Sequence, residues 1–436
     1  MKPPADQSSA FRRRTGAGVA EARVSCRVTQ PWGATYDANR AHEAAKVTAR
    51  VAALSVLIAV GLGASAQGAQ RGGAVAPVLQ SETAGVTPFQ GLTAHDVAYS
   101  GMDSVTSGGI RIIDGDTARI VATVYSSQYA NFAWAPDHRT LYISETYWAL
   151  GDRGTREDVL SIYGGPTLSN EGEIALPGRL ISDPKTHTFE LSPDGHYAYD
   201  YSFQPAPAVS VIDLRARKVA ASVEIPGCGL VFPFGKRGFA SLCADGSMAV
   251  ADSGAQGKYG VHRTKRFFDV MKDPVIDESV ADPHSGLALF TTYDGWVHPV
   301  HLGDTPRFDK AWSIEQAAGL SPATSHAGQI TWRPGGQVPF AYEPSRHRLF
   351  ALMHEGPPWS FEKPGTQIWV LDTRSHRLLH RWEVPQSAYL VAVTQDAHPL
   401  LFALSEEWLW VMNPESGAVL RATGIVTPGL VRVRGE

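Results

Sequence analysis

The chain has 436 residues, of which 43% are hydrophobic, and a formal net charge of −4. Residues 1–66 contain nine Lys or Arg and four Asp or Glu, a net charge of +5, so the rest of the chain carries −9. A chain this acidic, without a basic stripe, argues against a nucleic-acid-binding protein and against attachment to anionic membrane surfaces.

Residues 1–66 have the pattern of an N-terminal extension followed by an export signal. Lys46 and Arg50 precede an apolar run over residues 51–62, and the small residues 64–66 fit a signal-peptidase site that ends at Ala66. The run is shorter than the roughly 20 residues that span a bilayer, so a membrane anchor is the weaker alternative. We predict a periplasmic protein that is cleaved near Ala66 and has no membrane contact afterwards. We interpret residues 1–45 as the product of a start codon assigned too far upstream.

A short motif recurs seven times after this signal and an arm over residues 67–93. It consists of an extended apolar run, a turn rich in Pro, Asp or Gly, and an alternating strand. Clear copies begin at Trp134, Leu191, Ala281, Tyr342 and Val393, and weaker ones at Ala94 and Phe234. Each motif tends to be followed by a second hairpin, and repeats of about 40 residues with four short strands are typical of propeller blades. The sequence therefore predicts an all-β, seven-bladed β-propeller over residues 94–436, with a pair of β-sandwiches as the alternative.

Helical periodicity is nearly absent from these repeats. Residues 309–320 are the one short segment where we expect a helix.

Two cysteines, Cys228 and Cys243, remain if the export signal is removed. Since exported chains fold in an oxidising compartment, the pair predicts a disulfide, with two separate buried thiols as the alternative. Closing a loop of this length stabilises the folded state by roughly 3 kcal/mol.

Common catalytic signatures are missing from the chain. It has no GxSxG elbow, HExxH motif, P-loop or strand-linked Rossmann glycine motif. His298 and His301 are three residues apart on a predicted strand, which places them on opposite faces and prevents them from binding one metal ion. We predict no catalytic, cofactor-binding or metal-binding residue in this chain.

Two charged or aromatic clusters are candidates for a partner-binding surface. One is the loop that contains Arg153, Arg156 and Asp158, where structural ion pairing is the alternative. The other runs from Trp332 to Gly336, and the alternative there is a blade cap. Its candidate residues are Trp332, Arg333, Gly335 and Gly336.

Several of these strings resemble the heavy subunits of quinoprotein amine dehydrogenases. LSPDGHYAYDYSFQPAPAVSVIDL at 191–214, the cysteine pair, and RGTREDV at 153–159 resemble the heavy chain of methylamine dehydrogenase. Met102 to Val105, WRPGG at 332–336 and residues 353–373 are more similar to the large subunit of aromatic amine dehydrogenase. The resemblance extends from about Ala94 to the C-terminus.

This resemblance implies a periplasmic heterotetramer of two heavy chains and two small, disulfide-rich light chains. The light subunit would carry tryptophan tryptophylquinone, oxidise primary amines to aldehyde and ammonia, and pass electrons to a blue-copper protein of the amicyanin or azurin kind. The present chain would be a scaffold without a cofactor, and the two clusters would face the light chain or the substrate channel.

One segment departs from the family pattern. Members carry a loop after the first strand that places a Phe near the quinone, whereas here the segment after Val105 is shorter and contains no aromatic residue. The wall of the substrate channel is therefore expected to differ. The alternatives to a dehydrogenase subunit are a stand-alone periplasmic binding propeller without redox activity and a lactonase-like propeller hydrolase, for which the strands supply no evident ligand cluster.

Overall fold

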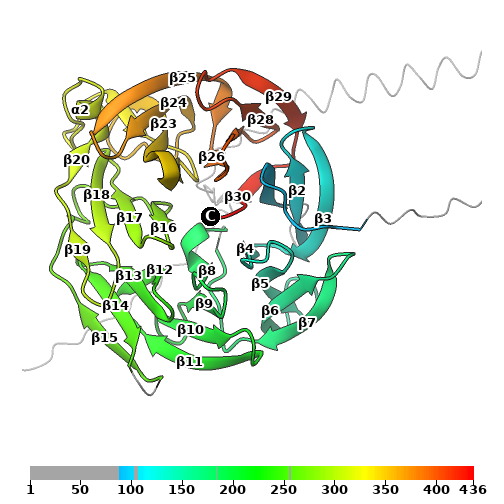
Figure 1. The fold of residues 1–436 in the computed structure, drawn as a ribbon. Helices are drawn as coiled ribbons and strands as arrows, with labels where there is room; N and C mark the ends of the chain where they lie inside the picture. The colour runs from blue at the N-terminus through cyan, green and yellow to red at the C-terminus, as the bar shows by residue number, and fades with distance from the viewer. Residues whose placement is uncertain (1–87, 103–106, 183, 255–256) are drawn as a thin grey trace, which may run out of the picture. The chain divides into compact units, whose positions relative to one another are not determined.

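Seven antiparallel sheets surround a central axis as the blades of a propeller (Figure 1). The computed structural model describes residues 88–102, 107–182, 184–254 and 257–436, which belong to the second of two units, Thr83–Glu436. The predicted all-β, seven-bladed propeller is confirmed. The proposed signal, the cleavage near Ala66 and the segment 103–106 lie outside the described residues, so those expectations stay predictions.

The first four blades each contain four strands. From the axis outward they are β30 (Pro428–Val433), β1 (Asp96–Met102), β2 (Ser107–Asp114) and β3 (Arg119–Ser127) in blade 1; β4 (Asn131–Trp134), β5 (Leu141–Trp148), β6 (Arg156–Gly164) and β7 (Ser169–Ala175) in blade 2; β8 (Phe189–Leu191), β9 (Tyr197–Ser202), β10 (Ala208–Asp213) and β11 (Lys218–Glu224) in blade 3; and β12 (Cys228–Phe234), β13 (Gly238–Cys243), β14 (Met248–Ser253) and β15 (Tyr259–Arg263) in blade 4.

Blades 5 and 6 each have an additional short strand. From the axis outward the strands of blade 5 are β16 (Val280–Asp282), β17 (Leu287–Thr291), β18 (Trp296–His301) and β19 (Arg307–Phe308), and β20 (Trp312–Ser313) is also paired to β18. In blade 6, β21 (Thr331–Pro334) and β22 (Phe340–Glu343) lie end to end along the inner edge of β23 (Arg348–Gly356), which is followed by β24 (Gly365–Asp372) and β25 (Arg377–Ala388). Blade 7 contains β26 (Leu390–Val393), β27 (Leu401–Leu404), β28 (Trp408–Met412) and β29 (Val419–Gly424). The helices are α2 (Ile314–Ala317), η1 (Thr186–Thr188) and η2 (Pro344–Arg346).

The ring closes through its C-terminal strand. β30 pairs with β1, so the last strand of the described chain supplies the innermost strand of the first blade. This pairing explains why the motif at Ala94 is weak in the sequence. In the other six copies the inner strand immediately precedes its hairpin, whereas here it arrives from the far end of the chain.

Apolar side chains fill each of the seven gaps between neighbouring blades. Seven separate clusters of buried residues occupy these gaps, and each draws on the facing sheets of two blades. Alternate strand residues point to opposite faces of a sheet, so a strand packed on both faces needs apolar residues at successive positions. The run Ile368 to Leu371 in β24, fully buried throughout, shows this pattern.

The expected helix at residues 309–320 is largely wrong. Within this segment Trp312 and Ser313 pair with β18 instead, and the helical part is limited to the four residues of α2. The Ser313 hydroxyl caps this turn by accepting a hydrogen bond from the backbone N–H of Gln316 at 3.1 Å. Tertiary pairing with a neighbouring strand therefore overrides the local helical pattern.

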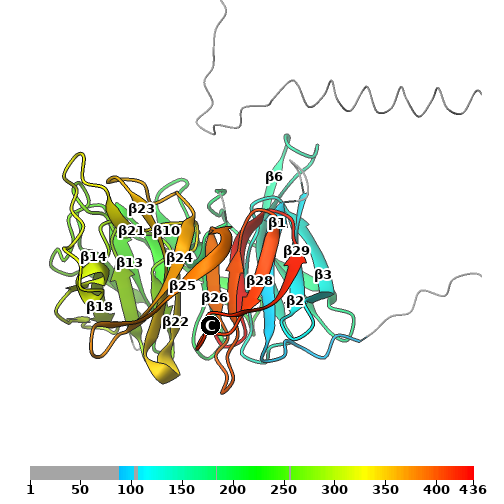
Figure 2. The same cartoon turned by 90° about the horizontal axis from the view of Figure 1, so that it is seen from above.

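The two faces of the ring differ in the connections they carry. Because strands alternate in direction, the turns between second and third strands share one face with the connections between blades. We call this the hairpin face. Figure 2, viewed edge-on, places β6 at its rim and β22 near the opposite rim.

Candidate functional site

Both clusters selected from the sequence lie on the hairpin face. The loop with Arg153 is the β5–β6 turn of blade 2, and Trp332 is on β21, at the start of the inner strand of blade 6. The sequence places them far apart, and the propeller topology brings them to the same side of the ring.

The β5–β6 turn divides into an exposed tip and an anchored base. Arg153 is exposed at the tip. At the base, Arg156 pairs with Asp158 at 2.8 Å, and Arg156 also donates to the backbone carbonyl of Arg179 at 2.8 Å. Arg156 and Asp158 therefore fasten the hairpin to the connection that enters blade 3, while Arg153 stays available at the surface.

A buried arginine that the sequence analysis missed lies beneath this hairpin. Arg179 is only 3% exposed and donates to the Ser144 hydroxyl at 2.9 Å and to the carbonyl of Tyr129 at 2.7 Å. The same Ser144 hydroxyl donates to Asp200. Burial raises the pKa of the Asp200 carboxyl to about 7, although the Arg179 charge opposes this shift.

Arg333 of the blade 6 cluster lies inside the molecule and not on its surface. Its side chain is 1% exposed and forms an ion pair with Asp294 in the β17–β18 turn. It also donates to the carbonyl of Thr324 at 2.7 Å. Arg333 therefore joins blades 5 and 6 and holds the long connection between them, and it cannot contact a partner directly.

The two glycines of this cluster permit close packing. Gly336 has φ of +125°, and a Cβ there would lie 2.5 Å from the carbonyl oxygen of Tyr389 in blade 7. A Cβ on Gly335 would clash with the ring of His354. Trp332 is half-buried, with its ring 5.4 Å from that of Trp369. The cluster thus forms a junction between blades 6 and 7.

The centre of the ring holds a cavity of about 290 Å³. Arg432 of β30 donates to Glu190 at 3.0 Å and to the carbonyl of Thr186 at 3.1 Å, and the Thr186 N–H donates to Glu278 at 3.0 Å. Burial opposes ionisation of Glu190, but Arg432 and His187 hold its pKa below the usual value. These contacts join blades 1, 3 and 5 across the axis, where Figure 1 shows β8 and β30 close together.

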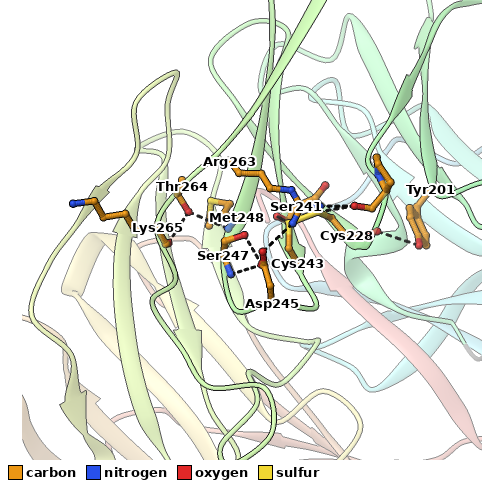
Figure 3. The surroundings of a disulfide bond; sticks show 11 residues. Tyr201, Cys228, Ser241, Cys243, Asp245, Ser247, Met248, Arg263, Thr264 and Lys265 are labelled. Atoms are coloured by element: carbon orange, nitrogen blue, oxygen red, sulfur yellow. Dashed lines mark hydrogen bonds and ion pairs between the residues drawn. A yellow bond between two sulfur atoms is a disulfide. The ribbon is translucent and has the colours of Figure 1, made fainter.

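The predicted disulfide is present between Cys228 and Cys243, which are register partners on β12 and β13 (Figure 3). Its Cα atoms are 3.9 Å apart. The adjoining turn is held by Asp245, which accepts from the N–H of Ser247 at 2.9 Å and pairs with Arg263 at 3.1 Å. The bond therefore fixes the hairpin face of blade 4.

The two histidines of β18 have different surroundings. The pKa of His298 is lowered to about 4 by burial, whereas His301 pairs with Asp309 at 2.9 Å. Within the described ranges, no group of three or more His, Cys, Asp or Glu side chains could hold a metal ion. None of the described helices is long and apolar enough to cross a membrane.

Comparison with known proteins identifies the relatives of this fold. The family model described as "Methylamine dehydrogenase heavy chain (MADH)" matches residues 100–427. The chain belongs to the methylamine dehydrogenase heavy chain family. Methylamine dehydrogenase heavy chains are 29% identical in Methylorubrum extorquens, over 70% of this chain and 74% of that one, and 26% identical in Methylophilus methylotrophus, over 78% and 82%.

Solved structures share the fold at low sequence identity. A dihydro-heme d1 dehydrogenase superposes with a TM-score of 0.50 and 13% identity, over 80% of this chain and 77% of that one. A protein of unknown function from Desulfotomaculum acetoxidans gives a TM-score of 0.50 and 11% identity, over 78% and 98%. At these low sequence identities the structural similarity supports only the fold of this chain.

Proposed function

We propose that this chain is the heavy subunit of a periplasmic amine dehydrogenase. Its membership of a heavy-chain family over residues 100–427 supports the role of an oxidoreductase subunit. In this proposal two heavy chains assemble with two small, disulfide-rich light chains. The light chain holds tryptophan tryptophylquinone, and this chain binds no cofactor.

The proposed reaction converts a primary amine and water into an aldehyde, ammonia, two protons and two electrons. The quinone of the light subunit supplies this two-electron oxidation, and a blue-copper protein of the amicyanin or azurin kind takes the electrons one at a time. The heavy chain contributes a rigid surface that positions the light chain and shields the reacting groups from water.

The distribution of exposed apolar side chains carries the proposal. Of the large apolar side chains exposed in the described residues, eight lie on the outermost strands, and the others gather on the hairpin face. The members of this second group are Tyr147, Leu150, Phe203, Met271, Leu320, Ile330, Trp359, Trp408 and Val426. Interfaces are enriched in large apolar and aromatic side chains, so the presence of nine such side chains on one face supports the hairpin face as the surface for a second subunit.

Two buried arginines support this role because they hold the turns of the hairpin face in place. Arg179 and Arg333 each connect segments of neighbouring blades, so the turns that carry the exposed side chains are held in fixed positions. A preorganised surface loses less conformational entropy when a partner binds.

The test is affinity purification of the tagged full-length chain from its native cells, with intact-mass analysis of co-eluting protein and an amine-dependent dye-reduction assay. We expect a smaller chain in equal amount whose mass includes a cross-linked tryptophylquinone. A chain that elutes alone and reduces no dye would contradict the proposal and favour the stand-alone binding propeller.

A further inference from the structure

A basic segment lies at the outer edge of blade 4 on the hairpin face. It comprises β15 and the start of the connection to blade 5, and residues 257–272 contain five Lys or Arg and one Asp, a net charge of +4. The chain beyond residue 66 carries −9 in total, so this segment has the opposite charge to the rest of the propeller. We call the exposed side chains Lys265, Arg266 and Lys272 the basic ridge.

The backbone of the basic ridge is fixed on the turn that follows the disulfide residue Cys243. The N–H of Phe267 donates to the carbonyl of Gly246 in this turn at 2.9 Å. A Cβ on Gly246 would be 2.9 Å from Cγ of Arg266, so the aliphatic part of the arginine packs on the turn. Figure 3 shows the Lys265 side chain extending away from the disulfide. A surface held in this way loses less conformational entropy when a partner binds.

The cations of the basic ridge are not neutralised within the chain. The neighbouring Arg263 pairs with Asp245 at 3.1 Å, so its charge is already balanced. Among the described residues, none of the three ridge side chains has an ion-pair partner. The acidic residue of the segment, Asp269, accepts a hydrogen bond from the N–H of Met271 at 3.1 Å. Three unpaired cations therefore outnumber one carboxylate at this surface.

Apolar side chains flank the basic ridge. The rings of Phe267 and Phe308 lie 5.1 Å apart where blades 4 and 5 adjoin, and Phe308 is 37% exposed. Met271, next to Lys272, is 79% exposed. Arginine, methionine and aromatic side chains are enriched in protein interfaces, whereas a polyanion is held mainly by cations. The mixture of charged and apolar groups therefore favours a protein as the partner.

We propose that the basic ridge is a docking site for an acidic loop of a partner protein. In this complex the three cations pair with carboxylates of the loop, and Phe308 and Met271 pack against its apolar side chains. Charge complementarity of this kind speeds association and disfavours partners with like charge. The inference does not depend on the proposed function, because the ridge and its support belong to this chain alone.

The test is fluorescence anisotropy of a fluorescein-labelled peptide of three Glu-Glu-Phe repeats, titrated with the purified full-length chain. A peptide of three Gln-Gln-Phe repeats is the neutral analogue. We expect saturable binding of the acidic peptide that weakens as the salt concentration rises from about 50 to about 300 mM. The neutral peptide should bind at least about tenfold more weakly, because it lacks the charge attraction.

Charge reversal locates the binding surface. Lys265→Glu combined with Arg266→Glu should weaken binding of the acidic peptide at least about tenfold, because like charges then face each other. The matched control is Lys236→Glu combined with Lys258→Glu, which makes the same change of net charge in two turns of blade 4 on the opposite face. Since distant charges are screened by salt, the control should keep the dissociation constant within about twofold. Melting curves check that each variant is folded.

Several outcomes would overturn the inference. They are no saturable binding, equal binding of the neutral peptide, and an equal loss of binding in the ridge variant and its control, which would show attraction to net charge alone. Heparin and phosphatidylglycerol vesicles are titrated in parallel. Tighter binding of either one, lost in the ridge variant, would show that the ridge recognises a polyanion or a lipid surface instead of a protein.

Discussion

At the residue scale, buried arginines decide how the hairpin face is held. Arg333 reaches Asp294, Thr324 and the carbonyl of Gly356, so its side chain connects three separate turns. A buried charge is tolerated only when it is paired, and removal of one partner leaves the other charge buried and unpaired.

We predict that Arg333→Ala lowers the free energy of unfolding by about 3–5 kcal/mol, because Asp294 would be left buried and unpaired. Urea denaturation measures the change. Arg153→Ala is the matched control, since that exposed side chain should contribute less than about 0.5 kcal/mol. Arg333→Met combined with Asp294→Asn should recover part of the loss. Equal stability of the Arg333 and Arg153 variants would contradict the assignment.

Asp200 leads to a prediction of how the free energy of unfolding depends on pH. Burial raises the pKa of this carboxyl to about 7, so the folded chain binds its proton more tightly than the unfolded chain does. Stability from this group is therefore largest at low pH, falls as pH rises from about 4 to about 7, and is constant above. Between these pH values the folded wild-type chain binds up to about one proton more than the unfolded chain, and Asp200→Asn should abolish this difference. Unfolding free energies measured against pH should show it, and identical slopes for both proteins would contradict it.

The sequence predicts some residue-level features and hides others. The disulfide was predictable from two cysteines in a chain that carries the pattern of an export signal, and Arg156 and Asp158 are close neighbours in one hairpin. Ser144 lies in blade 2, Asp200 in blade 3 and Arg179 in the connection between them, and their two hydrogen bonds join residues 35 and 56 positions apart. Such contacts depend on strand register across blades, for which a single sequence carries no local signal.

At the element scale, the interruption of the inner strand in blade 6 has a specific cause. β21 and β22 pair with successive parts of β23, and Gly335 and Gly336 form the bend between them. This bend brings the chain against Tyr389 and lets the N–H of Gly336 donate to the carbonyl of Phe361 at 2.8 Å.

We predict that Gly336→Ala destabilises the fold by roughly 3 kcal/mol, through backbone strain together with the clash against the Tyr389 carbonyl. Gly235→Ala is the matched control. That glycine also has positive φ, +56°, but a Cβ there would meet nothing within 4 Å. The control should lose only about 1–2 kcal/mol of strain. Thermal and urea unfolding of both variants test the difference, and equal losses would show that the junction is not tightly packed.

Turn chemistry made the blades predictable, whereas the connections between blades were not. Turns rich in Pro, Asp or Gly recur with enough regularity to count seven units. The segment at 309–320 shows the limit, because β20 pairs with β18, a contact within the blade that the local residue pattern does not reveal. Trp359 lies in the segment 353–373 that resembles the large subunit of aromatic amine dehydrogenase, but no repeating pattern around it distinguishes this exposed side chain from its neighbours.

At the scale of the whole molecule, the ring depends on one long-range pairing. β30 and β1 join the two ends of the propeller, and Arg432 extends the closure across the axis to blade 3. Without this strand, β1 would present an open edge and the apolar cluster between blades 7 and 1 would lose Val431 and Val433. Open strand edges promote association between chains.

Removal of residues 428–436 should therefore abolish the single cooperative unfolding transition and produce soluble aggregates, because both the closing strand and part of an interblade core are lost. Calorimetry and size-exclusion chromatography measure these two effects. The matched truncation removes residues 434–436 alone, which keeps β30 and all its pairing with β1 and should retain one cooperative transition and a monodisperse profile. A closed, cooperative ring in the longer truncation would mean that the six complete blades hold together through their own clusters, and that β30 serves mainly to place Arg432 at the central cavity.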